Sequence, residues 1–211
     1  MKNRRIMMSL MGVIICAVSV GVFKIAALGV DPFQSLMSGL DALIPISFGL
    51  LYVLVNLALL SFSLIVDRSK IGLATFINLF LLGYITDFTY SFLQTVIVNP
   101  SMPLRIFCLL AGVVVICFGS ALYMTADLGV STYDAIAIAL SGKWQLAPFQ
   151  YCRVATDLIC VLCGVALFLA AGGTISAIPT IAGVGTIITA FFMGPLIEYF
   201  NKTIARPMLK K

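Results

Sequence analysis

The phrase LGVDPF at residues 28–33 returns as LGVSTY at residues 128–133, 100 residues further along the chain. Both copies stand directly after a long apolar run, and each precedes a shorter segment. Glycine adopts backbone conformations that other residues resist, so Gly29 and Gly129 allow the chain to turn sharply. The repeated phrase therefore predicts the same helix break at two places in the fold.

The composition surrounding these phrases is that of a membrane protein. Hydrophobic residues make up 62% of the 211 residues and charged residues 10%, whereas soluble domains are about 45–50% apolar and about 25% charged. A segment in lipid must satisfy its own backbone hydrogen bonds, so only helices and closed barrels cross a bilayer. Because the apolar runs are continuous rather than alternating, we expect an all-α, polytopic membrane helical bundle without a soluble domain.

The apolar runs predict six transmembrane helices in a single membrane domain, 1–211. A span needs about 20 apolar residues. Two further segments are too short to cross unaided, and each follows one of the repeated phrases; we expect short broken helices, either re-entrant or interfacial. The predicted spans are 6–27, 47–66, 71–97, 104–126, 148–171 and 177–200, and the short segments are 31–44 and 131–142.

An ordered series of matches indicates an internal duplication. At a shift of 100 residues the glycines at 12 and 29 meet glycines, and after insertions near loops Asn56 meets Asp157 and Asp87 meets Glu198. The halves are repeat A, about 6–98, and repeat B, about 104–200, followed by a basic tail, 201–211. Each half holds three spans, an odd number, so we expect inverted repeats of the kind that build secondary transporters.

The residues beside each break are typical of helix starts. Asp31 and Ser131 are suited to cap the short helices, Pro32 fits a first helical turn, and Asp134 lies in the first turn of the second short helix. Helix amino termini inside the membrane would favour an anion or carboxylate. Two interpretations stay open: the breaks form symmetric gates, or they are ordinary loop turns at span ends.

Basic residues predict the orientation. Lys and Arg are enriched in cytoplasmic loops, and the loops on the far side of six spans carry only Lys24 and Arg105 near the span ends. We therefore expect both termini in the cytoplasm, with the net charge of +5 directed at the lipid bilayer and not at nucleic acid. The cytoplasmic set is Lys2, Arg4, Arg5, Arg68, Lys70, Lys143, Lys202, Arg206, Lys210 and Lys211.

Polar residues within spans are costly and are functional candidates by default. Arg153 precedes Asp157 by four residues, so the two side chains can pair along one helix face. The candidate substrate-binding residues are Asn56, Asn78, Arg153 and Asp157, and the terminal acids Asp87 and Glu198 are candidates for capping, pairing or gating. The alternative is structural: a neutralised ion pair and an Asn bonding between helices.

Several chemistries are disfavoured. The chain has no histidine, its six cysteines lie within spans, and no phosphate-binding glycine motif stands in a strand–turn–helix setting. We expect no enzymatic activity, no catalytic residue, no metal site and no cofactor.

Two stretches resemble a family of bacterial integral membrane proteins, YczE/YyaS/YitT. ALGVDPFQSLMSGL is similar to its Leu-Gly-x-x-Pro-Trp-x-x-Leu-x-x-Gly-Leu signature, and GLATFINLFLLGYITDF to its Gly-x-x-Thr-x-x-Asn-x-x-x-x-Gly-x-x-x-Asp stretch. The resemblance covers about 12–200 and departs from the family where Phe33 stands in place of Trp and Gln34 in place of an acid. It implies a multi-pass protein of the bacterial cytoplasmic membrane and supplies no substrate.

The sequence leaves three functions open. The first is a secondary transporter or permease for a small solute. The second is a substrate-binding membrane subunit of an ATP-driven importer, docking through the small residues Gly12, Ala17 and Gly21 of the first span. The third is a membrane regulatory or scaffold protein without transport. A homodimer or a partner membrane subunit is compatible with each.

Overall fold

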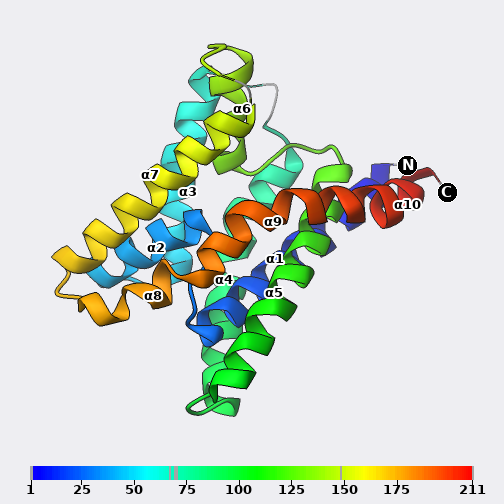
Figure 1. Cartoon of the computed structure of the whole chain (residues 1–211). Helices are drawn as coiled ribbons and strands as arrows, with labels where there is room; N and C mark the ends of the chain where they lie inside the picture. The colour runs from blue at the N-terminus through cyan, green and yellow to red at the C-terminus, as the bar shows by residue number, and fades with distance from the viewer. Residues whose placement is uncertain (1, 67, 69–70, 148, 211) are drawn as a thin grey trace.

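The computed structural model describes residues 2–66, 68, 71–147 and 149–210, and these residues form helices without any strand (Figure 1). A 3₁₀ turn at Ile175–Ala177 precedes α8, and a π-helical turn at Asn201–Ala205 joins α9 to α10. The helices are α1 Lys2–Ala26, α2 Pro32–Leu43, α3 Phe48–Val66, α4 Leu73–Val96, α5 Met102–Thr125, α6 Thr132–Gly142, α7 Phe149–Ala170, α8 Ile178–Ile181, α9 Val184–Phe200 and α10 Arg206–Lys210.

The predicted spans and short segments are present, and the last span differs most from its prediction. It is interrupted after α8, where Gly183 caps α9 and its N–H donates to the Thr186 hydroxyl at 3.2 Å. Over its described residues, 201–210, the predicted basic tail is helical. Six helical segments of the described chain are long and apolar enough to cross a membrane: Asn3–Ala26, Phe48–Val66, Leu73–Val96, Met102–Thr125, Tyr151–Ala170 and Ile175–Leu209.

Helices α1 and α5 lie side by side and pack closely against each other (Figure 1). A Cβ atom at Gly12 would lie 2.7 Å from the Gly119 carbonyl oxygen, and one at Gly119 would lie 2.8 Å from that of Gly12. The corresponding pair, at positions shifted by 100 residues, is Gly112 and Ser19. The Ser19 hydroxyl donates a hydrogen bond to the Gly112 carbonyl oxygen at 2.7 Å. Small residues therefore bring the two backbones together twice along the helix pair, as membrane helices often do.

The two repeated phrases form the same backbone break. Ala27 and Gly29 have φ values of 48° and 97°, and Asp127 and Gly129 have 53° and 109°. The left-handed region is costly for residues with a Cβ, so each break concentrates strain just after a long helix. The chain then turns, and the short helices α2 and α6 begin within three residues of these glycines.

Each break is pressed against the start of a helix from the other half of the chain. A Cβ atom at Gly29 would lie 2.5 Å from the Gly183 nitrogen, and one at Gly129 would lie 2.5 Å from the Gly72 nitrogen. The Leu28 carbonyl accepts a hydrogen bond from the Gly185 N–H at 2.7 Å, and the Leu128 carbonyl accepts one from the Ala74 N–H at 2.9 Å. These bonds satisfy backbone groups that lipid could not.

The short helices also pack on the opposite half. Helix α2 lies along α7, where a Cβ atom at Gly39 would lie 2.2 Å from the Gly164 carbonyl oxygen. Helix α6 packs against both α3 and α7. Each half of the chain thus contributes one short helix to a core that neither half completes alone.

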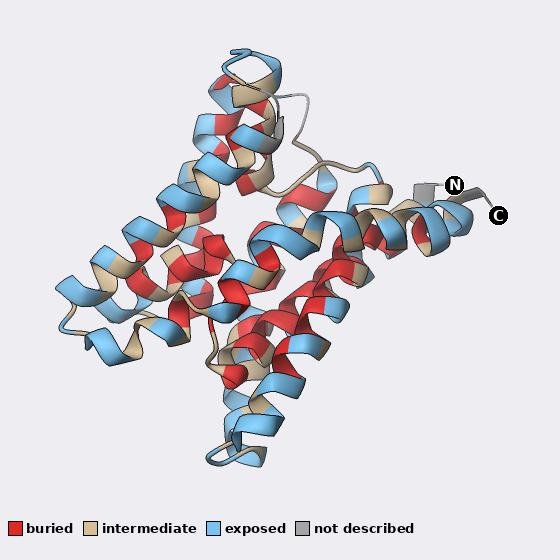
Figure 2. Cartoon of the chain, in the orientation of Figure 1, coloured by how far each residue is buried: buried red, intermediate tan, exposed pale blue. Residues whose placement is uncertain are grey.

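Buried residues follow the inner faces of the long helices, and exposed apolar residues cover the outer ones (Figure 2). Phe88 is 73% exposed and Phe191 also 73%, values typical of side chains that face lipid in a membrane bundle and not water. The outer surface of α4, α7 and α9 is accordingly apolar over most of its length.

One end of the bundle gathers the beginning and the end of the described chain. Met8 of α1 packs in one cluster with Ala205 and the partly buried Leu209. Arg5 lies 3.6 Å from the Asp127 carboxylate, and the Lys143 ammonium donates to the Val66 carbonyl oxygen. The α4–α5 connection lies far from this end (Figure 1).

We predict that alanine at the break glycines destabilises the fold by about 3 kcal/mol or more, because strain adds to a backbone clash. In Gly129→Ala the new Cβ meets the Gly72 backbone, whereas Gly172, at φ 87°, has open space around its Cβ position. Gly172→Ala should therefore cost only about 1 kcal/mol, from strain alone. Gly194→Ala, in open space within α9, should be neutral or stabilising by about 0.5–1 kcal/mol. Unfolding free energies in mixed micelles measure all three; equal losses at Gly129 and Gly172 would contradict the clash.

Candidate functional site

The two short helices start side by side inside the bundle. Asp31 caps α2, its carboxylate accepting from the Gln34 N–H at 3.2 Å, and Ser131 caps α6, its hydroxyl accepting from the Asp134 N–H at 3.1 Å. Phe33 in the first turn of α2 stacks on the ring at the matching position of α6, Tyr133, with centroids 5.0 Å apart. The broken helices therefore meet through one aromatic pair.

Around this pair lies an ion cluster centred on Arg153 of α7. Its Nη1 atom donates to the Asp134 carboxylate of α6, and its Nε atom lies 3.2 Å from the Asp157 carboxylate one turn along α7. The guanidinium also lies 4.6 Å from the centroid of the Tyr133 ring, within the range of a cation–π interaction. The predicted Arg153–Asp157 pair is thus part of a larger group that includes a residue of the second break.

Hydroxyl groups complete the coordination of both carboxylates. Asp134 accepts from Ser131 at 2.7 Å and from Tyr123 of α5 at 2.9 Å, and Asp157 accepts from Tyr133. The side chains of Asp134 and Asp157 are 19% and 14% exposed. Hydrogen bonds to a charged acceptor are stronger than neutral ones, so the cluster holds α5, α6 and α7 in a fixed relation.

The charges of this region do not cancel. Arg153 faces Asp134 and Asp157 directly, and Asp31 lies close enough to Arg153 and Asp157 for a Coulomb interaction. Within the described chain, Asp31 has no cation within 4 Å. One guanidinium therefore contacts two carboxylates and lies in the electrostatic surroundings of a third, and an ionised excess of this kind is expensive inside a membrane.

A neutral network borders the cluster on the α3 side. Asn56 is 1% exposed; its amide N–H donates to the Tyr52 carbonyl at 2.8 Å, and its carbonyl accepts from the Thr132 hydroxyl of α6. The Tyr52 hydroxyl in turn donates to Asn78 of α4 at 3.1 Å, and its ring lies edge-on to Phe33 with centroids 5.9 Å apart. Asn56 and Asn78 are therefore bonded between helices, next to the ion cluster.

The remaining candidates lie apart from the Arg153 cluster or at the starts of the short helices. The amino termini of α2 and α6, expected to suit an external anion, already face the chain's own carboxylates Asp31 and Asp134. Glu198 lies apart from the cluster, bonded to Arg206 at 3.2 Å and beside Lys202 at 3.5 Å. Asp87 lies in the electrostatic surroundings of Lys24, away from Arg153. Pro32 begins α2 as its first residue.

Sequence reasoning missed the four hydroxyl-bearing partners Tyr52, Tyr123, Thr132 and Tyr133. The internal duplication contained a signal for two of them. Tyr52 occupies the position that matches Arg153, and Tyr123 occupies the position that matches Phe23. No group of three or more His, Cys, Asp or Glu side chains in the described chain is placed to hold a metal ion.

A helical bundle with six candidate spans and an ion cluster in its interior defines the class: a multi-pass membrane protein. The chain belongs to DUF6198, a family of unknown function whose model matches residues 3–202. The chain is 25% identical to the uncharacterized protein YyaS of Bacillus subtilis over 95% of this chain and 94% of that one. It is 24% identical to the uncharacterized membrane protein YczE of the same organism, over 82% and 74%.

A third relative, an uncharacterized protein of Haemophilus influenzae, is 28% identical over 66% of this chain. The matched region spans 57% of that relative's length. No solved structure matches. The similarity to YczE and YyaS confirms the expected resemblance of the chain to the YczE/YyaS family.

We predict that Arg153→Gln is the most damaging single change in the cluster, because it leaves two buried carboxylates uncompensated. Removing one partner of a buried ion pair costs on the order of 3–5 kcal/mol. Asp157→Asn should cost less, since Arg153 keeps Asp134 and an amide oxygen can still accept from Tyr133. Arg206→Gln, in an exposed pair with Glu198, should cost about 0–1 kcal/mol. Unfolding in mixed micelles gives the order; a loss for Arg153→Gln no larger than for Arg206→Gln would contradict the cluster's structural role.

Proposed function

We propose that this protein is a secondary transporter of a small solute in the bacterial cytoplasmic membrane. One observation carries the proposal: two broken helices, one from each half of the chain, meet inside the bundle at a shared ion cluster. Secondary transporters build midplane sites from broken helices at the interface of two repeats. Ionisable residues inside a membrane mark ion or substrate pathways.

The matched contacts support an inverted duplication. Gly29 against Gly183 has its counterpart in Gly129 against Gly72. Arg105 reaches the Ala27 carbonyl at 3.1 Å, and Arg5, 100 residues earlier, reaches Asp127 at 3.6 Å. With three spans in each half, the second half is turned over relative to the first. The two breaks then face opposite sides of the membrane, which is the arrangement that alternating access uses.

The charge count supports coupling to a cation. With all three carboxylic acids ionised, one guanidinium leaves an excess of two negative charges, which binding of a proton or a monovalent cation would reduce. Arg153, with Asp134 and Asp157, is then the part of the site where the bound cation and the solute meet. Asn56 and Asn78 form the neutral wall beside it. The proposal assigns no enzymatic step to this chain.

The ATP-driven alternative loses its docking surface. Gly12, Ala17 and Gly21 were expected to face a partner subunit, and this expectation is wrong. Gly12 packs against Gly119, Ala17 is 0% exposed, and a Cβ atom at Gly21 would lie 2.8 Å from the Thr89 side chain. These small residues serve the packing of α1 within its own chain.

We predict that both termini are cytoplasmic. The bundle end that holds Arg5, Lys143 and Arg206 is the more basic one, and basic ends stay in the cytoplasm. A carboxyl-terminal fusion should be active as a cytoplasmic reporter and inactive as a periplasmic one. Cysteines at Asp127 and Asn99, placed in a cysteine-free background, should be labelled from opposite sides of the membrane. Labelling of both from one side would refute the inverted arrangement.

We predict that proteoliposomes holding this protein alone accumulate a member of an isotope-labelled metabolite panel when a proton or sodium gradient is imposed. Tyr133→Phe keeps the ring that stacks on Phe33 and removes the hydroxyl that bonds Asp157. It should lower uptake at least tenfold in a folded protein. Arg206→Gln, far from the cluster, should retain uptake. Absence of uptake above empty liposomes by correctly folded protein would contradict the transporter proposal.

A further inference from the structure

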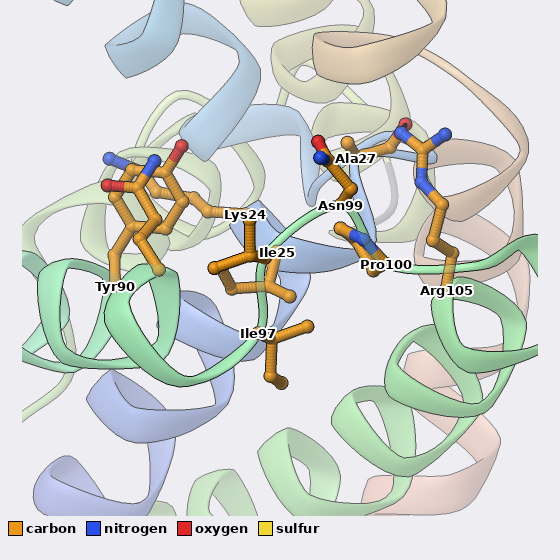
Figure 3. A pocket seen from close by; sticks show the side chains of 10 residues that line it. Lys24, Ile25, Ala27, Tyr90, Ile97, Asn99, Pro100 and Arg105 are labelled. Carbon is orange, nitrogen blue, oxygen red and sulfur yellow. Dashed lines mark hydrogen bonds between the residues drawn. The ribbon is translucent and has the colours of Figure 1, made fainter.

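A pocket of about 520 Å³ lies at the end of the bundle formed by the α4–α5 connection (Figure 3). The last turn of α1 supplies Lys24, the last two turns of α4 supply Tyr90 and Gln94, and the start of α5 supplies Arg105. Asn99 stands on the connection between α4 and α5, with its backbone at φ 51°. The pocket is separate from the Arg153 cluster and shares no residue with it.

The side chains that line this pocket include two cations and no acid. In Figure 3 Lys24 extends toward Tyr90 on one side, and Arg105 stands across the pocket beyond Asn99 and Pro100. The lining also offers the amides of Gln94 and Asn99, which are exposed and able to donate hydrogen bonds. A cavity with cations at two sides and neutral donors between them favours an anionic ligand.

Arg105 is held in place by the protein before any ligand binds. Its Nε atom donates to the Ala26 carbonyl at 2.8 Å and its Nη2 atom to the Ala27 carbonyl at 3.1 Å. These two bonds cap the carboxyl end of α1, where a cation is favourable. They occupy two of the five N–H donors of the guanidinium, and Arg105 has no acidic partner within 4 Å in the part of the chain described.

Lys24 is positioned in the same way by aromatic rings. Its ammonium lies 3.2 Å from the centroid of the Phe48 ring and 5.5 Å from that of Tyr90. Asp41 and Asp87 influence it electrostatically, but neither lies within ion-pair distance among the described residues. Cation–π contacts orient a lysine without neutralising it, and Lys24 is one of the residues that line the pocket.

The matching end of the bundle shows that this charge is particular to the pocket. There Arg5 takes the place of Arg105 and has an acidic partner, Asp127, at the position where this end has Ala27. Met124 stands at the position of Lys24. The pocket therefore has a second cation, Lys24, that the matching end lacks, and it has Ala27 where the matching end has the acid Asp127. The backbone break is the same at both ends.

We propose that this pocket binds a small anion carrying carboxylate or phosphate groups, anchored by Arg105 and assisted by Lys24. The same chemistry is offered by a soluble anion and by the headgroup of an anionic lipid. Binding at this site does not depend on transport, so the proposal stands or falls separately from the proposed function.

The test measures the local potential with a thiol probe. Gln94→Cys, in a background with the six native cysteines replaced, is placed in phosphatidylcholine nanodiscs, which expose both faces. Its reaction rates with an anionic and a cationic methanethiosulfonate are compared at low salt. We expect the anionic reagent to be favoured on the order of fivefold by the nearby cations. Lys24→Met should lower this preference, and Lys202→Met, at the other end, should not.

Anion binding is measured as protection of the same cysteine. Inorganic phosphate or succinate should slow labelling in phosphatidylcholine nanodiscs if the ligand is soluble, and phosphatidylglycerol in the nanodisc should slow it if the ligand is a headgroup. Protection of either kind should weaken at least threefold in Lys24→Met. Arg105→Lys keeps the positive charge but loses the pair of hydrogen bonds to the Ala26 and Ala27 carbonyls. This variant should remain folded and bind the anion more weakly. Equal rates for the two reagents, with no protection by phosphate, succinate or phosphatidylglycerol, would overturn the proposal.

Discussion

The fold depends on a contact between backbone and backbone, made twice. At Gly29 and Gly129 the chain turns with positive φ directly against the Gly183 and Gly72 backbone, where no Cβ would fit. The adjoining carbonyls of Leu28 and Leu128 are bonded across the same contact. Because lipid offers no replacement for these bonds, the turn and its partner helix must form together. These turns end α1 and α5, and they direct the short helices α2 and α6 into the interior of the bundle.

The sequence predicted this part of the structure well because the constraint is local and repeated. A glycine after a long apolar run, followed by a capping residue, has few solutions in a membrane. The matches at a shift of 100 placed Asp31 and Ser131 at the same position of two helices, and the structure has them as caps. The last span was predicted less well. The linear pattern does not mark a new helix start at Gly183, and its contact with Gly29 explains why the helix restarts there.

The ion cluster could be predicted only in part. Arg153 and Asp157 are four residues apart on one helix, and spacing alone suggests their pair. Asp134 reaches Arg153 from α6, and Tyr123 reaches Asp134 from α5; such contacts follow from how helices cross, which the linear pattern does not encode. The stacking of Phe33 on Tyr133 joins the two matched positions at the place where the halves meet. A duplication hints at that contact but does not require it.

The two halves share a backbone design and differ in chemistry. Position 34 carries Gln where 134 carries Asp, position 52 carries Tyr where 153 carries Arg, and position 56 carries Asn where 157 carries Asp. At these three positions the charged residue belongs to the second half and the neutral hydrogen-bonding residue to the first, whereas Asp31 and its match Ser131 have the reverse order. In the proposed transporter, the equivalent breaks would give two conformations of similar energy, and the unequal charge of the two halves would favour one of them. A bound proton or cation would change that preference in such a transporter, because it would alter the excess charge around Arg153 and leave the glycine contacts of both breaks intact.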